Sequence, residues 1–173
     1  MGEARLRIEP LAGHDRTLFS CGEPAVDEWF RERASQMSRR GLAAVHLLVE
    51  QATGTVVGFY TLSNYTVVAT DLPTNIGKGM PRSLALPAHL IGQLGVDQRH
   101  QGQGYGELLL YDALTPAARM TGDSASLGVV VHALSDRAAA WYRRHGFEPF
   151  PGHPLHLIMR MKDIRAFFGA ENP

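Results

Sequence analysis

The sequence predicts a mixed α/β fold, and three observations support this prediction. The chain has 173 residues, close to the length at which one hydrophobic core is usual. Its hydrophobic content of 45% and charged content of 20% are ordinary for a globular protein, so disorder and fibrous repeats are excluded. Segments with the period of strands alternate along the chain with segments of helical period. We expect residues 1–173 to form a single domain.

The N-terminal half predicts a strand, a helix and an antiparallel hairpin. Residues 5–9 alternate polar and apolar side chains, which is typical of a strand. A helix is expected over 24–41, because acidic residues gather at its start and arginines toward its end, as the helix dipole favours. Residues 42–50 and 55–62 are rich in Val, Leu and aromatic side chains and predict the hairpin. Residues 66–87, rich in proline and glycine, predict a long loop or short irregular helix.

The C-terminal half predicts strands alternating with helices. A strand over 90–96 runs into a glycine-rich turn, after which leucines and alanines carry a helical pattern. A buried strand over 127–134 follows, and Ser135 is suited to cap a helix that ends near His145. Two closing strands are predicted over 147–150 and 155–161.

Composition narrows the classes of function. Seventeen Lys and Arg balance seventeen Asp and Glu, so nucleic-acid binding would need a local basic patch. Cys21 is the single cysteine, which excludes an internal disulfide and is ordinary for a reducing cytosol. The N-terminus lacks the apolar run of a signal peptide, and no segment has the length of a membrane span, so we expect a cytoplasmic protein. His153 and His156 have no further ligands at metal spacing, and no metal is expected.

The glycine-rich turn is suited to bind phosphate. Glycines let anionic oxygens approach backbone N–H groups, and the N-terminus of the following helix adds partial positive charge. The dinucleotide-binding pattern, started at Gly102, fails because Glu107 stands where its third glycine is needed. The nucleotide-triphosphate loop pattern fails because no Lys-Ser/Thr pair follows the last glycine. Both common nucleotide-binding patterns are therefore excluded.

Two signatures in this chain resemble the GNAT family of acetyl-CoA-dependent N-acetyltransferases. The first is Gln101-x-x-Gly104-x-Gly106 with Arg99 just upstream, and the second is the segment 138–147, which reads Ala-x-x-Trp-Tyr-Arg-Arg-His-Gly-Phe. The resemblance implies a mixed, mostly antiparallel central sheet flanked by helices. It also implies that the strands around 90–96 and 127–134 splay apart, so that acetyl-CoA lies in the wedge between them.

The resemblance assigns roles to individual residues. Tyr142 is the candidate general acid that protonates the departing thiolate. Backbone groups of the 94–96 segment would meet the pantetheine arm, amides of 101–106 would hold the pyrophosphate, and Ser135 would cap its helix with a possible cofactor contact. The cofactor-binding residues are Leu94, Gly95, Val96, Gln101, Gly102, Gln103, Gly104, Tyr105, Gly106 and Ser135.

Segments 19–30 and 56–63 resemble a narrower group, the GNAT toxins of bacterial toxin–antitoxin pairs. That resemblance implies acetylation of the α-amino group of aminoacyl-tRNA, which blocks translation, and neutralisation by a small ribbon-helix-helix antitoxin. The pKa values of amines favour an α-amino group as the acceptor. Deprotonation at pH 7 costs about 4.6 kcal/mol for a lysine but only about 1 kcal/mol for an α-amino group. No carboxylate that could act as a base lies between His89 and Val96, although water or His132 could still relay a proton.

Alternatives to this hypothesis stay open at the level of sequence. The acceptor could be a small amine or a protein N-terminus, and a CoA-binding or protein-interaction module without turnover is a further alternative. A possible homodimer could assemble an RNA-binding surface. Basic residues that could contact tRNA phosphates are Arg31, Arg39, Arg40, Lys78, Arg82, Arg143, Arg144 and Arg160.

Overall fold

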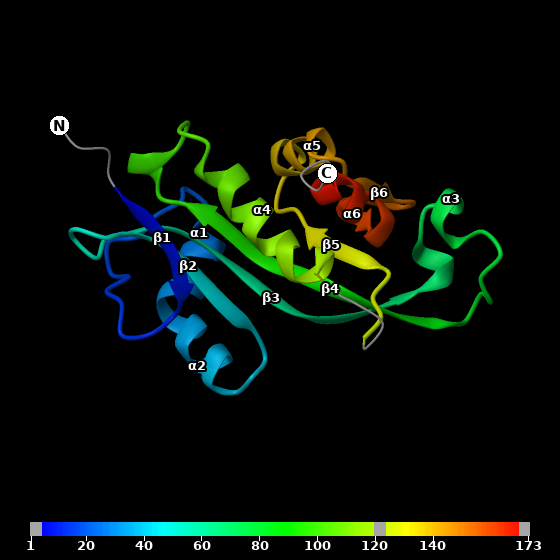
Figure 1. Ribbon diagram of the computed structural model, residues 1–173, viewed down its shortest axis with the longest axis horizontal. Helices are drawn as coiled ribbons and strands as arrows, with labels where there is room; N and C mark the ends of the chain where they lie inside the picture. The colour runs from blue at the N-terminus through cyan, green and yellow to red at the C-terminus, as the bar shows by residue number, and fades with distance from the viewer. Residues whose placement is uncertain (1–4, 120–123, 170–173) are drawn as a thin grey trace. The chain divides into compact units, whose positions relative to one another are not determined.

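The computed structural model describes residues 5–119 and 124–169 and confirms the mixed α/β fold (Figure 1). Seven strands are hydrogen-bonded in the order β1-β2-β3-β4-β5-β7-β6. Two compact units are distinguished, one with residues 5–63 and 92–113 and the other with 64–91 and 114–169. The elements that pass through both units are β3 (Val56–Val68), β4 (Ala85–Val96) and α4 (Tyr105–Ala118).

The first unit is built on an antiparallel sheet. β1 (Leu6–Pro10) pairs with β2 (Ala44–Glu50), which pairs with the first part of β3, so the predicted strand and hairpin are confirmed. The predicted helix is also confirmed, as α1 (Pro24–Glu28), a π-helical turn η1 (Trp29–Arg33) and α2 (Ala34–Arg39). The π-helical turn was not predicted from the sequence.

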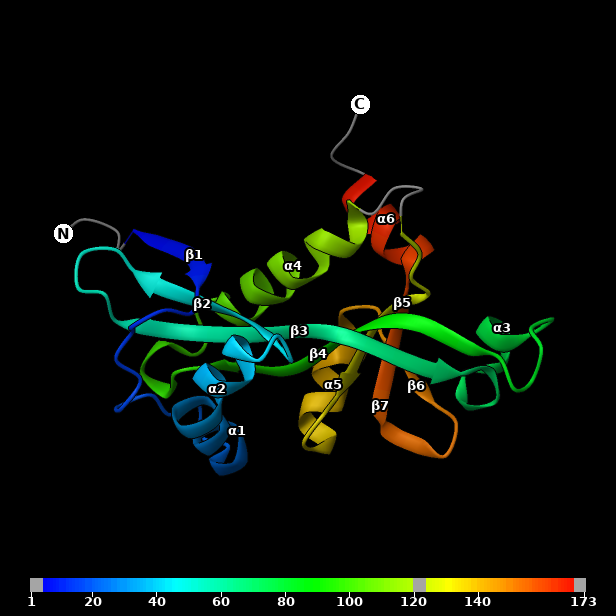
Figure 2. The same ribbon diagram turned by 90° about the horizontal axis from the view of Figure 1, so that it is seen from below.

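Strand alternation gives this sheet two buried faces. Val26, Phe30 and Ala34 pack against one face, where the rings of Phe30 and Phe59 stack with centroids 3.9 Å apart. The residue that follows Phe59 points to the other face, and the Tyr60 hydroxyl donates to Asp112 of α4 at 2.6 Å. Figure 2 shows α1 and α2 on one side of β2 and β3 and the first half of α4 on the other.

The second unit joins one parallel and two antiparallel strand pairs. β5 (Gly128–His132) pairs in parallel with β4 and antiparallel with β7 (His153–Arg160), which pairs with β6 (Glu148–Phe150). The parallel pairing ends at Ile91 opposite Val131, and β4 continues to Val96 beyond that point. β5 itself ends one residue later, at His132, so the expected splaying of the two strands stays a prediction.

Short helices complete the second unit. They are η2 (Ala69–Asp71), α3 (Thr74–Gly77), α5 (Asp136–Arg144) and α6 (Met161–Gly169). One apolar cluster joins Ile76 of α3 to Val130 of β5 and Ile158 of β7. The helix predicted after Ser135 is confirmed as α5.

Two regions differ from what the sequence predicts. The segment 66–87 is not one irregular stretch, because β3 extends to Val68, two short helices follow, and β4 begins at Ala85. Pro87 fits within a strand because its carbonyl accepts a hydrogen bond from Leu127 N, and that contact needs no N–H from the proline. The last strand ends at Arg160, and α6 follows it where no helix was predicted. Within the described residues, no helix is long and apolar enough to cross a membrane.

Candidate active site

The glycine-rich turn lies in the first unit, between the end of β4 and α4. A short 3-10 helix, η3 (Gln98–His100), leads into it. Gly102 and Gly104 have positive φ angles of 75° and 82°, a conformation that side chains other than glycine rarely adopt. The first amides of α4 have no acceptor within the helix, so the turn presents N–H groups together with the positive end of the helix dipole. This local geometry is suited to bind a phosphate group.

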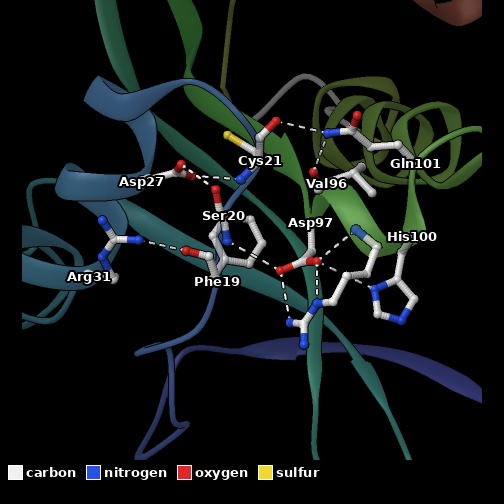
Figure 3. Close-up of polar contacts among 10 residues, drawn as sticks. Phe19, Ser20, Cys21, Asp27, Arg31, Val96, Asp97, His100 and Gln101 are labelled. Carbon is white, nitrogen blue, oxygen red and sulfur yellow. Dashed lines mark hydrogen bonds and ion pairs between the residues drawn. The ribbon is translucent and has the colours of Figure 1, made fainter.

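A buried carboxylate organises the chain just before this turn (Figure 3). Asp97 is only 1% exposed. It accepts hydrogen bonds from Nε and Nη2 of Arg99 at 2.8 and 3.0 Å and from the backbone N–H of Arg99 and of Ser20 at 3.0 and 3.2 Å. Burial by itself raises the pKa of Asp97, but these hydrogen bonds outweigh burial and hold the pKa below its usual value. The carboxylate therefore stays charged and ties residue 20 to the end of β4.

A second set of contacts fixes the same N-terminal segment. Asp27 accepts from Ser20 Oγ at 3.0 Å and from Cys21 N at 2.7 Å. Gln101 Nε2 donates to the carbonyl oxygens of Cys21 and Val96 at 2.8 and 2.9 Å (Figure 3). The side-chain amide of Gln101 is therefore occupied by hydrogen bonds within the protein. Its backbone N–H is the group that can bind a phosphate.

The end of β4 is held tightly from the side of β3. Asp97 N donates to Val57 O at 2.8 Å, and a β-carbon placed on Gly58 would lie 2.9 Å from the carbonyl oxygen of Gly95. Cys21 packs against Gly95, and burial raises the pKa of its thiol to about 12. Cys21 is therefore a packing residue, and the 94–96 backbone has a fixed position for binding an extended ligand.

Tyr142 and Ser135 lie in the second unit on α5. Ser135 Oγ accepts from Ala138 N at 3.1 Å, which confirms the predicted helix cap. The Tyr142 ring contacts Trp141 and Phe147 edge-on, and the residue is 8% exposed. Burial raises the pKa of Tyr142, so its hydroxyl stays protonated at neutral pH and can donate a proton. Among the described residues, that hydroxyl has no hydrogen-bond partner.

The predicted basic residues fall into separate groups. Arg39 and Arg40 are exposed at the end of α2, and Arg143 and Arg144 are exposed in the last turn of α5. Lys78 and Arg82 line a hollow of about 290 Å³ beside α3. The other two predicted residues make contacts within the protein: Arg31 donates to Phe19 O at 2.7 Å, and Arg160 pairs with Asp163 at 2.9 Å.

Sequence reasoning missed the carboxylates that organise the turn. Asp97 follows a strand directly and stands two residues before Arg99, a spacing that allows a local ion pair. Asp27 gave no such signal, because on the sequence it is one of several acids in the first helical turns. In the described parts of the chain, no three His, Cys, Asp or Glu side chains are grouped to hold a metal ion.

Comparison with known proteins decides the family. Residues 43–149 match the model of the acetyltransferase (GNAT) domain. The chain belongs to the GNAT acetyltransferase family. The matched range contains β4, the glycine-rich turn and all of α5, so the predicted membership and the predicted acetyltransferase activity are confirmed.

Other GNAT proteins are similar over nearly the whole chain. A tRNA-acetylating toxin of Mycobacterium tuberculosis is 38% identical, covering 90% of this chain and 91% of the relative. A probable toxin TacT of Sinorhizobium fredii is 33% identical, covering 97% and 98%. A solved structure of AtaT complexed with acetyl-methionyl-tRNAfMet is 26% identical with a TM-score of 0.85, covering 95% of this chain and 99% of that one. A tyrosine-to-phenylalanine mutant of AtaT, bound to acetyl-CoA and the C-terminus of its antitoxin AtaR, is 25% identical with a TM-score of 0.81, covering 94% and 98%.

Proposed function

We propose that this GNAT protein is a toxin that transfers the acetyl group of acetyl-CoA to the α-amino group of aminoacyl-tRNA and thereby blocks translation. The similarity to a tRNA-acetylating toxin at 38% identity over nine-tenths of the chain carries this proposal. The solved complex of AtaT with acetyl-methionyl-tRNAfMet supports the same acceptor. We place the reaction in the cytoplasm, where charged tRNA is used.

We also propose that the chain forms the single acetyltransferase domain expected from the sequence. The basis is the chain itself, because β3, β4 and α4 each pass through both units without a linker. The amides of the turn from Gln101 to Gly106 bind the pyrophosphate, and the 94–96 backbone binds the pantetheine arm. Tyr142 donates its proton to the thiolate that leaves when the amine attacks the thioester. Acetyl-CoA supplies the acetyl group, and the protein's residues bind it and move protons.

The acceptor fits the absence of a carboxylate on β4. No Asp or Glu occurs between Ala85 and Val96, so this strand has no carboxylate to deprotonate a strongly basic amine. An α-amino group, with a pKa of about 7.7–8.0, is neutral in a useful fraction at pH 7, whereas a lysine is not. We assign tRNA contacts to predicted basic residues that are exposed among the described residues, namely Arg39, Arg40, Lys78, Arg82, Arg143 and Arg144.

We further propose that a ribbon-helix-helix antitoxin neutralises the protein. The support is the resemblance to the toxin group and the complex of AtaT with its antitoxin. A homodimer would double the number of basic groups available to one tRNA, and light scattering during size-exclusion chromatography tests for it.

Acetylation of a complete pool of charged tRNA tests the main proposal. The purified protein is incubated with acetyl-CoA and the pool, the tRNA is digested, and N-acetyl-aminoacyl-adenosine is sought by mass spectrometry. Product is expected only with charged tRNA, and deacylated tRNA and omission of acetyl-CoA are the controls. If small amines or a protein N-terminus are acetylated while the whole tRNA pool is not, the assigned acceptor is wrong.

A further inference from the structure

A polar cluster in the second unit lies outside the site assembled above. His132 is the last residue of β5, and its Nε2 lies 3.3 Å from the Tyr65 hydroxyl of β3. His156, its register partner on β7, stacks on it with ring centroids 4.0 Å apart. His153 lies on the far side of His156, with centroids 5.4 Å apart. The cluster thus joins three strands at the end of the strand that leads into α5.

His132 is suited to accept a proton. Burial, followed by the neighbouring His156, lowers its pKa, so the imidazole is neutral at pH 7. The groups that face it are Tyr65 and His156, with His153 behind, and none of the described carboxylates forms an ion pair with it. A neutral ring without a carboxylate partner keeps a lone pair available.

The two faces of the strands separate His132 from Tyr142. His132 and His156 share a face with Val130 and Ile158, which belong to the apolar cluster around α3. Met159 points to the opposite face, where its Cε lies 3.3 Å from a β-carbon placed on Gly146, the residue just after the C-cap of α5. The imidazole and the helix that carries the phenol therefore lie on opposite faces of this part of the sheet.

We propose that His132 is the general base of the acetyl transfer and accepts the proton of the acceptor amine. The inference rests on the function proposed above. A thioester attacked from one face of the sheet needs its proton acceptor on the side of the incoming amine and its proton donor on the side of the leaving sulfur. His132 and Tyr142 meet this requirement from opposite faces.

The proton balance is complete. The amine nitrogen forms a bond to the carbonyl carbon, and the carbon–sulfur bond breaks. In the tautomer that this step requires, Nε2–H of His132 donates to the Tyr65 oxygen, and the Nδ1 lone pair takes the proton released by the amine. The thiolate takes the proton of Tyr142, and solvent then restores both side chains. The net products are the acetylated amine and the free thiol of CoA.

Replacement of His132 tests the base directly. H132Q should lower kcat for acetyl transfer at pH 7 at least roughly a hundredfold, the lower end of general-base effects, and should move the acidic limb of the pH profile to higher pH. Acetyl-CoA affinity, measured by calorimetry, should match that of the wild type. H153Q, which changes an exposed histidine of the same cluster, is the matched control and should keep kcat within about twofold.

Chemical rescue separates a base from a merely structural residue. Imidazole added to H132A should restore kcat in proportion to the concentration of neutral imidazole, and it should leave H153Q unchanged. If H132Q keeps the wild-type rate and pH profile, or if imidazole does not rescue H132A, His132 is not the base. If the wild-type protein gives no acetylated aminoacyl-tRNA at all, the proposed function fails and the base assignment fails with it.

Discussion

The Tyr142 hydroxyl makes no hydrogen bond to another described residue, so no neighbouring group holds its proton. Its ring packs edge-on against Trp141 and Phe147, and those contacts do not involve the oxygen. Tyr142→Phe should therefore keep the fold and acetyl-CoA affinity while lowering acetyl transfer at least about tenfold, because the thiolate loses its proton donor. Steady-state acetylation of charged tRNA, beside a thermal melt, measures both effects.

The pH profile gives a second measure of the same residue. Burial raises the pKa of Tyr142, so ionisation of the phenol should not limit the wild-type rate below pH 10. Y142F should lower the rate by a similar factor throughout this range. An unchanged rate in Y142F, with the protein folded, would remove this tyrosine from the mechanism.

The role of a single residue could be predicted where it depends on neighbours in the sequence, and could not be predicted where it depends on contacts with distant residues. The Ser135 cap follows from a short-range rule and is confirmed. The link from Asp27 through Ser20 to Asp97 was not predictable, because it joins residues 70 or more positions apart. The side-chain role of Gln101 likewise depends on a long-range contact, to the carbonyl oxygen of Cys21.

At the scale of elements, the approach to the glycine-rich turn depends on Asp97. Asp97→Asn keeps the size of the side chain but removes the charge that four hydrogen bonds use. We expect it to lower the free energy of unfolding by about 1.5–3 kcal/mol, the range for hydrogen bonds to charged groups. Acetyl-CoA should also bind more weakly, since the turn loses its anchor to the 19–21 segment.

A partly exposed Asp–Arg pair provides a control for the substitution of Asp97. Asp163 pairs with Arg160 Nε at 2.9 Å, and Asp97 pairs with Arg99 Nε at 2.8 Å, but Asp163 is partly exposed. Asp163→Asn should cost less than about 1 kcal/mol, as exposed ion pairs do. Urea unfolding and calorimetric titration of acetyl-CoA compare the two. Equal losses of stability, or full acetyl-CoA affinity in D97N, would show that the buried carboxylate does not organise the turn.

Helices and strands could be predicted where the apolar residues have a clear helical or strand period, or where a glycine or a capping residue marks the end of the element. The hairpin of β2 and β3 and the helix α5 follow from such signals and are confirmed. α6 was missed because its first apolar residue follows the last strand without a turn residue between them. The ion pair between Arg160 and Asp163 lies at this boundary, but it is seen only in the structure. The early start of β4 was missed because a proline was interpreted as a loop signal, whereas the position of Pro87 needs only its carbonyl.

At the scale of the whole molecule, partly buried histidines make stability depend on pH in both units. Burial lowers the pKa of His46 in the first unit and of His89 and His132 in the second. Above the ordinary histidine value of about 6.5, both folded and unfolded states are neutral and stability is complete. As pH falls below that value, the unfolded chain takes up protons first, so stability is lost. Protonation of Asp97 also lowers stability, but at more acidic pH, because the pKa of this carboxylate is held below its usual value.

This dependence tests whether the two units form the single domain expected from the sequence. Calorimetry between pH 7.5 and 5.5 should show one transition whose midpoint falls as pH falls, because three elements are continuous through both units. H46F keeps the stack on Tyr60 and removes a buried ring nitrogen that has no partner among the described residues. H46F and H89Q should each flatten the pH dependence of that same transition, while H153Q, at an exposed position, leaves it unchanged. Two transitions, one responding to H46F and the other to H89Q, would mean that the units unfold independently.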